Sequence, residues 1–402
     1  MERKIALFYA SVGTGHKAAA FALKEWCEAE HPNVEIFCKD LLDYVPSWMR
    51  RAISSSYLFM ARRCPWLWDR FYKSTDNKKW SLFSAFWKDI HKIISNIYIH
   101  RLLGDMNKFL PDAVLSTHFF GMSSLLDNWG RDVPIYFVDT DFLSHRLQRD
   151  PRFSGWFVGS EEAARQHRAD NLPASAGLIK NFGIPISMAY ASPICVKEAR
   201  EQLGVGANAV YVLIAGGGIG AGSLGEVTDS MLGKPKWRID VICGENSKLY
   251  ESLRDKYYPF KNISVHGFVD DLRVRCAACD VLVIKPGGLS IAEAASAGTA
   301  MLFLDPLPGQ EQYNCEYFLE RGAAMRLFEI RRTGEVLKEL LELPGKLDTM
   351  RDNARAIGRP SAAQNILSFV TDKVDNTIQI TPDKYSELAD IESLKQAVSS
   401  QD

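Results

Sequence analysis

The chain has 402 residues, of which 47% are apolar and 24% are charged, and its formal net charge at pH 7 is −1. This length is enough for two domains of ordinary size, and the apolar fraction excludes a largely disordered chain. A net charge this close to zero provides no overall attraction to nucleic acid. We therefore expect two buried cores and no nucleic-acid partner.

The composition also predicts a cytoplasmic location. The opening residues, MERKIALFY, become polar too quickly for a signal peptide. No uncharged apolar run reaches the roughly 18 residues that a membrane-spanning helix needs. The eight cysteines are scattered, which is typical of reduced thiols. Cys276 and Cys279 form a CxxC pair, but no second pair or histidine cluster lies nearby, so we expect no metal or redox chemistry there.

Short apolar runs alternate with helical patterns along the chain, which is typical of α/β layers with parallel sheets. The expected strands of the first half are Ile5–Tyr9, Val34–Phe37, Ala113–Ser116, Ile135–Val138 and Trp156–Val158. Those of the second half are Val210–Ala215, Ile239–Cys243, Ile263–His266, Val281–Ile284 and Ala300–Leu304. We therefore predict two Rossmann-like domains, at 1–186 and 197–350, with a linker near 186–196. Crossover helices at 351–375, the last near Ser361–Thr371, and a polar tail at 376–402 would follow.

Each predicted domain opens with a strand, a glycine loop and a helix. Residues 13–18 and 216–221 both match the G-x-G-x-x-A pattern of dinucleotide-binding sites. Neither half has a well-placed acidic residue at the end of its second strand to hold a ribose, so the pattern does not favour NAD. The alternative is a tight turn that packs a helix on a sheet.

His16 is unusual in such a loop. At the start of a helix it would lie over the carboxyl ends of the strands, where open α/β sheets bind ligands. A helix amino terminus disfavours the imidazolium and so promotes the neutral ring, which can accept a proton. The residue is therefore a candidate general base, with a structural role as the alternative.

Residues 44–103 differ from the rest of the chain in charge and aromatic content. They hold 13 aromatic residues, including five of the nine tryptophans, and 11 Lys and Arg against three acids. The segment thus carries +8, which leaves −9 for the remainder. Basic residues attract anionic lipid, and aromatic residues suit the headgroup boundary. We predict an insert that docks on an anionic membrane, the alternative being a helical subdomain with solvated basic faces.

The sequence Asp139-Thr140-Asp141 ends the expected strand 135–138. Two carboxylates at this spacing can hold a divalent cation against a diphosphate. The alternative is a turn at a strand end with a helix cap. The residues alone leave both possibilities open.

Two consecutive strand ends in the second half carry glycine and proline together with polar groups. Gly287 and Gly288 precede a helix expected to begin near Ser290. Glycines let backbone amides approach an anion, and a helix amino terminus carries about half a positive charge. This loop therefore suits a diphosphate.

Three polar residues near this loop complete the pattern of a ligand site. Glu293 lies one turn into the helix, where its carboxylate can accept hydrogen bonds from both ribose hydroxyls. Gln310 and Glu311 follow the next strand and can bind sugar hydroxyls. A diphosphate, a ribose and a hexose together describe a nucleotide sugar.

Several motifs occur in an order that resembles a known family. They are Gly15-His16, Thr140-Asp141-Phe142 with His145, Gly183-Ile184-Pro185, Gly216-Gly217-Gly218, Cys243-Gly244-Glu245-Asn246, Lys285-Pro286-Gly287-Gly288-Leu289 and Pro308-Gly309-Gln310-Glu311-x-x-Asn314. Over residues 4–370 the chain is similar to the monogalactosyldiacylglycerol synthases and processive diacylglycerol glycosyltransferases. These are inverting enzymes of the GT-B fold, related to the transferase that forms lipid II.

The resemblance implies a UDP-sugar donor, a lipid acceptor, no cofactor and no metal in the chemistry. The implied donor residues are Gly217, Gly218, Gly287 and Gly288 at the diphosphate, Phe268 and Val269 at the uracil, Glu293 at the ribose, and Gln310 with Glu311 at the sugar. His16 corresponds to the proposed base, and Asp141 and His145 are expected on the acceptor side. The family has a tryptophan soon after this histidine, whereas the next one here is Trp156, and the first loop has fewer glycines than is common.

We therefore expect a GT-B fold in which two domains face a cleft and a final helix crosses back to the first. The predicted function is inverting transfer of a hexose from a UDP-sugar to a membrane lipid, with diacylglycerol as the expected acceptor. The enzyme is expected to be peripheral, on the inner face of the cell membrane. Transfer to an isoprenoid-linked or other amphiphilic acceptor is the alternative. A UDP-sugar epimerase would not need the basic and aromatic insert, and a nucleotide-sugar sensor would not need His16.

Overall fold

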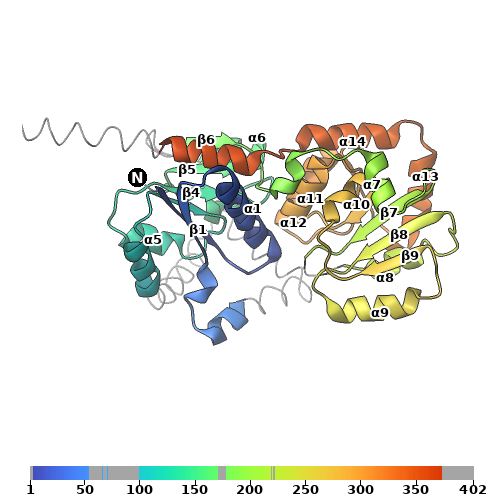
Figure 1. Cartoon of the computed structure of the whole chain (residues 1–402), viewed down its shortest axis with the longest axis horizontal. Coiled ribbons are helices and arrows are strands. Elements are labelled where there is room, and N and C mark those ends of the chain that lie inside the picture. Colours follow the sequence, from blue (N-terminus) through green and yellow to red (C-terminus); the bar gives the residue numbers. More distant parts are fainter. Residues whose placement is uncertain are drawn as a thin grey trace, which may run out of the picture.

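The computed structural model describes residues 3–53, 66, 70, 99–170, 178–218, 220 and 222–373. Within them the chain forms two six-stranded sheets, each covered by helices (Figure 1). All strand pairs are parallel. Most of the basic and aromatic insert 44–103 and the tail 376–402 lie outside the described residues.

The first sheet has the strand order β2-β1-β3-β4-β5-β6. Its strands are β1 (Arg3–Tyr9), β2 (Val34–Asp40), β3 (Ala113–Ser116), β4 (Ile135–Val138), β5 (Gly155–Val158) and β6 (Leu178–Asn181). Its helices include α1 (Thr14–Glu30), α5 (Met122–Asn128) and α6 (Glu161–Ala169), with short 3-10 turns η1 (Leu41–Asp43) and η2 (Arg146–Gln148), and residues 47–53 and 99–109 are also helical.

The second sheet has the order β12-β11-β10-β7-β8-β9. Its strands are β7 (Val210–Ala215), β8 (Trp237–Ile242), β9 (Ile263–His266), β10 (Val281–Ile284), β11 (Met301–Phe303) and β12 (Ala324–Arg326). The helices around it are α7 (Val196–Gln202), α8 (Leu224–Asp229), α9 (Ser247–Tyr257), α10 (Leu272–Ala278), α11 (Gly288–Ser296), α12 (Gln310–Glu320), α13 (Thr333–Glu342) and α14 (Lys346–Ile357). Two further 3-10 turns are η3 (Met188–Ala191) and η4 (Ile330–Arg332).

Both sheets place their glycine loops where the strand order changes direction. In the first sheet β1 lies between β2 and β3, and in the second β7 lies between β8 and β10. At such a point the connections diverge to opposite faces of the sheet and leave a crevice at the carboxyl ends of the strands. The loops after β1 and β3, and those after β7 and β10, therefore lie at the two crevices.

The ten strands predicted from apolar runs all form: five have the predicted bounds, and the other five differ by one to three residues at one or both ends. The structure adds β6 and β12, which the sequence analysis missed. Both are short strands at a sheet edge, and the LIKN and AMR sequences are only partly buried. An edge strand with one solvated side lacks the continuous apolar run that marks a central parallel strand.

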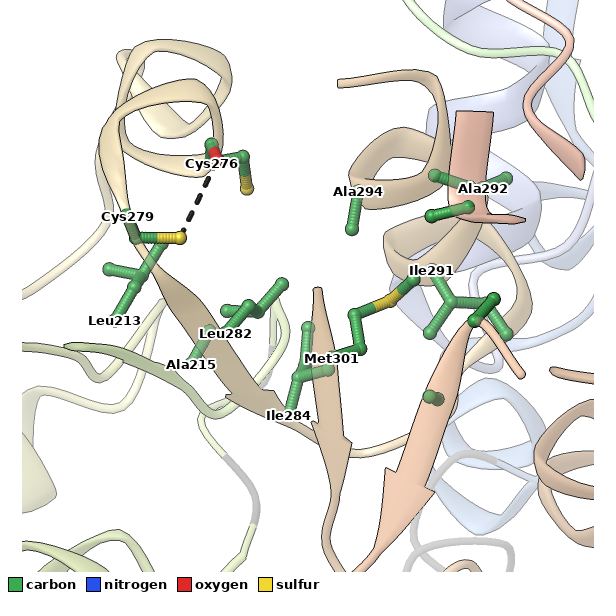
Figure 2. Packing of buried hydrophobic residues seen from close by; sticks show 14 of the residues in the cluster. Leu213, Ala215, Cys276, Cys279, Leu282, Ile284, Ile291, Ala292, Ala294 and Met301 are labelled. Carbon is green, nitrogen blue, oxygen red and sulfur yellow. Dashed lines mark hydrogen bonds between the residues drawn. The ribbon is translucent and has the colours of Figure 1, made fainter. Parts of the chain in front are cut away.

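Helix α11 is fixed by the core beneath it, and this sets the position of its amino terminus. Ile291 and Ala294 are fully buried against Leu282 and Met301 of the adjacent strands (Figure 2). Glu293 lies on another face of the helix and is only half-buried. The same core encloses Cys276 and Cys279, which are free thiols whose pKa values are raised by burial.

The chain crosses between the sheets twice, and the two crossings touch. Gly183, with a φ of +96°, leaves no room for a Cβ beside the side chain of Arg359 and packs near Ala362. Residues 362–373 are helical and place Ala363, Ile366, Leu367 and Val370 in the core of the first sheet. The predicted final helix therefore crosses back to the first domain, where Figure 1 shows it in red beside β5 and β6.

The first part of the predicted linker 186–196 packs against the second sheet, whereas most of residues 191–196 is exposed. Ile184 and Ile186 are buried in the core of the second sheet together with Tyr190 of η3. A short apolar segment that fills a core position holds the crossing in place better than a solvated polar linker would.

Candidate active site

His16 lies in the first turn of α1, directly after the loop that ends β1. Its Nδ1 is 2.7 Å from the carbonyl oxygen of Thr117 and 3.1 Å from the hydroxyl of Thr140. A carbonyl oxygen only accepts hydrogen bonds, so Nδ1 carries the hydrogen in the neutral ring. The lone pair of Nε2 then remains available to accept a proton.

The surroundings of His16 keep the ring neutral at pH 7. Burial lowers its pKa to about 4, while the bond to Thr117 and the charge of Asp139 act in the opposite direction. The ring of His118 lies edge-on to it, with the centroids 4.6 Å apart. His118 accepts a hydrogen bond from Phe120 N at Nδ1, and burial holds its pKa well below the usual value. Two neutral rings therefore adjoin at this site.

His118 is a site residue that the sequence analysis missed. It follows β3, the strand next to β1, in the sequence Ser116-Thr117-His118. A polar cluster at the end of a predicted strand was the available signal. Its proximity to His16 depends on β1 and β3 being neighbours, which the order of strands along the chain does not reveal.

The glycine loops of the second sheet meet the first domain at the same place. A Cβ on Gly218 would lie 2.7 Å from Thr14, and one on Gly288 would overlap the carbonyl oxygen of Thr140. By contrast, no atom lies within 4 Å of the Cβ positions of Gly217 and Gly287. One glycine of each loop is thus in contact across the domains, while its neighbour faces open space.

Asn314 of α12 connects the two domains through buried hydrogen bonds. Its Nδ2 donates to Oδ1 of Asp141 at 2.8 Å, and its Oδ1 accepts from Phe142 N at 2.9 Å. The same Nδ2 is 3.2 Å from the carbonyl oxygen of Pro286, which precedes the loop into α11. Burial raises the pKa of Asp141 to about 6, against the lowering effect of Asn314. The end of β4 is therefore tied to the loop that precedes α11.

Glu293 presents an unpaired carboxylate near this loop. Among the described residues its side chain has no hydrogen-bond or ion-pair partner, and burial raises its pKa to about 7. Burial raises the pKa of nearby Tyr190, and the charge of Glu293 adds to that rise. A ligand with two adjacent hydroxyl donors would satisfy such a group and favour its ionised form.

The remaining donor candidates follow β11 and β9, two strands of the second sheet that are separated by β10, β7 and β8. Gln310 and Glu311 begin α12 instead of lying in a loop, and Glu311 accepts a hydrogen bond from Leu307 N at 2.8 Å. Phe268, just beyond β9, leaves 66% of its surface exposed, and Val269 beside it is only partly buried. An exposed aromatic ring suits contact with a flat heterocycle such as uracil. The uracil contact at Phe268 and Val269 stays a prediction.

Comparisons with known proteins agree with this two-domain arrangement. Residues 16–186 match the family model described as "Monogalactosyldiacylglycerol (MGDG) synthase", and residues 231–357 match "Glycosyl transferases group 1". The chain is 27% identical over 391 residues to the probable monogalactosyldiacylglycerol synthase 3 of Oryza sativa subsp. japonica, covering 91% of this chain and 73% of that protein. It is 28% identical over 273 residues to the processive diacylglycerol beta-glucosyltransferase of Staphylococcus carnosus, covering 67% of each.

A solved structure shares the fold. The crystal structure of MurG from Acinetobacter baumannii has a TM-score of 0.57 and 16% identity, and the match covers 92% of this chain and 99% of that one. The chain is a glycosyltransferase with the GT-B fold, and its sequence is similar to the monogalactosyldiacylglycerol synthases and processive diacylglycerol glycosyltransferases. The fold and the family resemblance predicted from the motifs are thereby confirmed.

The two aspartates of the D-x-D sequence serve different partners in this transferase. Asp139 Oδ2 accepts from the Ser144 hydroxyl, whereas Asp141 accepts from Asn314 of the other domain. Within the described residues no group of three or more His, Cys, Asp or Glu side chains is arranged to hold a metal ion. Each carboxylate therefore has at least one hydrogen-bond donor among the described residues.

His145 of the transferase forms a local cap. Its Nδ1 accepts from Leu147 N at 3.2 Å, and its own backbone N–H donates to Gln148 Oε1 at 2.6 Å, so that the pair closes a capping box at η2. The side chain is buried. These contacts account for its position, and its place on the acceptor side stays a prediction.

Proposed function

We propose that this protein transfers a hexose from a UDP-sugar to a membrane lipid, with diacylglycerol as the favoured acceptor and with inversion at the anomeric carbon. The observation that carries the proposal is the juxtaposition of His16 with the glycine loops of the second domain. A Cβ placed on Gly15 would lie 4.0 Å from the Cβ of Leu289, so the loop that carries His16 adjoins the start of α11. The matching family models and relatives support the same reaction class.

In the proposed reaction the acceptor hydroxyl oxygen attacks the anomeric carbon of the sugar. The bond between that carbon and the β-phosphate oxygen breaks on the opposite side, and its electron pair leaves with UDP. The hydroxyl proton passes to Nε2 of His16, whose Nδ1–H is held by Thr117. A positioned base of this kind typically contributes about 10²–10⁴-fold to the rate.

The donor would be held mainly by backbone groups. The loops at Gly217 and Gly218 and at Gly287 and Gly288 would accept the diphosphate, whose charge the amino terminus of α11 stabilises. Glu293 would bind the ribose, and Phe268 with Val269 would contact the uracil. Gln310 and Glu311 would bind the hexose near Asp141. The charge of Glu311 is close enough to Asp141 to contribute to the rise in its pKa, which burial mainly causes.

The acceptor side would face a membrane. Trp48 and Trp66, both in the insert 44–103, leave 66% and 69% of their surfaces exposed. Of the helices that the structure describes, none is both long and apolar enough to cross a bilayer. We infer peripheral attachment to the inner face of the cell membrane through the basic and aromatic insert. Liposome sedimentation tests this: binding to anionic vesicles should fall as salt rises, because surface charges are screened within about 8–10 Å at physiological ionic strength.

A different amphiphilic acceptor is the leading alternative. An isoprenoid-linked lipid would use the same base and donor loops and differ only in the acceptor. The epimerase alternative has less support because one matching family model is described as a synthase and the other as glycosyl transferases. A UDP-sugar epimerase would act on the nucleotide sugar in the absence of any lipid.

Incubation of the protein with radiolabelled UDP-glucose, UDP-galactose or UDP-N-acetylglucosamine distinguishes these possibilities. Each donor would be offered with diacylglycerol vesicles, with isoprenyl phosphate vesicles or without lipid. We expect label in a glycosyl diacylglycerol, and NMR of the product should show the β-anomer formed from the α-linked donor. Label that stays in an epimerised UDP-sugar, or that enters only the isoprenyl lipid, would contradict the proposal.

A further inference from the structure

Three polar side chains are buried together behind His16 in the first domain. They are Asp139 at the end of β4, Ser144 in the following loop and His167 in α6. Their exposed fractions are 1%, 3% and 0%. None of them had a role in the sequence-based interpretation of the site beyond the D-x-D pattern.

The hydrogen bonds among these residues run in one direction. The Ser144 hydroxyl donates to Oδ2 of Asp139, so its oxygen is free to accept. Nε2 of His167 lies 3.0 Å from that oxygen and must donate to it, which places a hydrogen on Nε2. The ring is further held against Trp156, with the centroids 4.9 Å apart.

At each end of this series of hydrogen bonds a buried polar atom has no partner among the described residues. Within the part of the protein that the structure describes, neither Oδ1 of Asp139 nor Nδ1 of His167 makes a hydrogen bond. An unpaired buried acceptor typically costs about 1–3 kcal/mol, and more when the group is charged. A carboxylate in such a place is a poor choice for stability alone, which suggests a role in the site.

The carboxylate is connected to the proposed base through the next residue. The backbone N–H of Asp139 donates to Phe157 O at 2.8 Å, which anchors the end of β4. Thr140 follows, and its hydroxyl lies 3.1 Å from Nδ1 of His16. The charge of Asp139 opposes the effect of burial on the pKa of His16. Among the described residues, the other titratable group that faces the ring is His118, from the loop after β3.

We propose that Asp139, held by Ser144 and His167, is a positioning residue for His16: it fixes Thr140 against the ring and keeps a negative charge behind it. This inference rests on the proposed function, in which His16 accepts the acceptor proton. When Nε2 takes up that proton the ring becomes a cation in a buried site. A nearby carboxylate stabilises this cation, which makes the neutral ring a stronger base.

The test is a double-mutant cycle on turnover at saturating UDP-sugar. Asp139→Asn keeps the shape of the side chain and removes its charge. We expect it to lower kcat by about 10-fold, which corresponds to about one pKa unit, the lower end of the 1–3 units typical of a nearby opposite charge. KM for the UDP-sugar should stay unchanged. In a His16→Ala background the same substitution should have no further effect, because the two residues act through one step.

NMR of the histidine rings provides a readout that a structural role would not change. Long-range ¹H–¹⁵N spectra of the unsubstituted protein should show His16 with its hydrogen on Nδ1. In Asp139→Asn its titration should move to lower pH. Ser144→Ala retains the carboxylate but loses its support, and should move the titration in the same direction by less. If Asp139→Asn does not fold, the His16 titration in Ser144→Ala provides the test in its place.

Asp132→Asn, which alters an exposed acid of the same domain, is the matched control and should leave kcat and the His16 titration unchanged. Equal losses for Asp139→Asn with and without His16 would show a merely structural residue and overturn the inference. An unchanged titration in both Asp139→Asn and Ser144→Ala would do the same. Failure of the proposed function appears separately, as normal turnover in His16→Ala alone.

Discussion

The loops after β1 and β7 occupy corresponding places in the two sheets, yet they offer a ligand different groups. The loop after β1 leads into α1 with a titratable side chain, His16, whose ring is fixed by Thr117. The loops after β7 and β10 offer glycines, of which Gly217 and Gly287 face open space. Proton transfer needs a side chain with a suitable pKa, whereas a diphosphate is held by backbone amides that must come close. The difference divides the proposed reaction into a chemical half and a binding half.

The largest expected effect tests the chemical half. His16→Ala should lower turnover by about 10²–10⁴-fold because the acceptor hydroxyl loses its base. The affinity for UDP should remain unchanged, since the proposed donor contacts lie in the other domain. Steady-state kinetics and titration calorimetry measure the two quantities. A loss of UDP affinity with normal turnover at saturation would make His16 a donor ligand and erase the division between the domains.

The reciprocal change tests the binding half. Glu293→Ala should weaken UDP binding by about 1.5–3 kcal/mol, the loss expected for hydrogen bonds to a charged group. Turnover at saturating donor should fall far less than in His16→Ala. Calorimetry with UDP decides the point, and circular dichroism shows whether the variant is folded. If a folded Glu293→Ala binds UDP normally, the ribose lies elsewhere.

Two adjacent glycines, Gly287 and Gly288, allow the domain contact and the ligand-facing position of one loop to be tested separately. Alanine at Gly288 would place its Cβ against the carbonyl of Thr140, and relieving such an overlap typically costs about 1–3 kcal/mol. We expect Gly288→Ala to separate the domains at this point and reduce turnover. Gly287→Ala has room for its Cβ and a φ of −72°, so it should leave the unfolding temperature unchanged.

UDP binding distinguishes these two variants further. The Cβ of Gly287→Ala enters the open space proposed for the diphosphate and should weaken UDP binding without affecting stability. Thermal unfolding and calorimetry on both proteins provide the measurements. Identical stability of the two variants would mean that the contact between Gly288 and Thr140 is not maintained in solution.

The smallest effect concerns pH and the ligand-free protein. Burial raises the pKa of Glu293 from an ordinary 4.5 to about 7, so the folded state binds more protons than the unfolded state between these values. This contribution to stability is full below about pH 4.5 and is lost as the pH rises through about 7. Glu293→Gln does not ionise, so its unfolding temperature relative to the unsubstituted protein should rise between pH 5 and pH 8. A constant difference across this range would show that Glu293 titrates normally.

The sequence by itself determined the elements that depend on neighbouring residues. Apolar runs predicted ten of the twelve described strands, and the spacing of Gly287, Gly288 and Glu293 predicted a helix start with a carboxylate one turn later. The structure begins α11 at Gly288, two residues earlier than expected. Such features follow from local backbone preference and burial, which a short window of sequence contains.

Only the tertiary structure decided which distant groups meet. His16 bonds to Thr117, 101 residues away, and Asn314 reaches Asp141 across 173 residues and a domain boundary. Asn314 belonged to a motif noted in the sequence, yet nothing in that motif indicated a bond to the other domain. Strand order, domain closure and burial set these contacts and the shifted pKa values of His16 and Glu293. A hydrogen-bond partner and a local dielectric are properties of the packed chain, because they depend on residues that no local pattern contains.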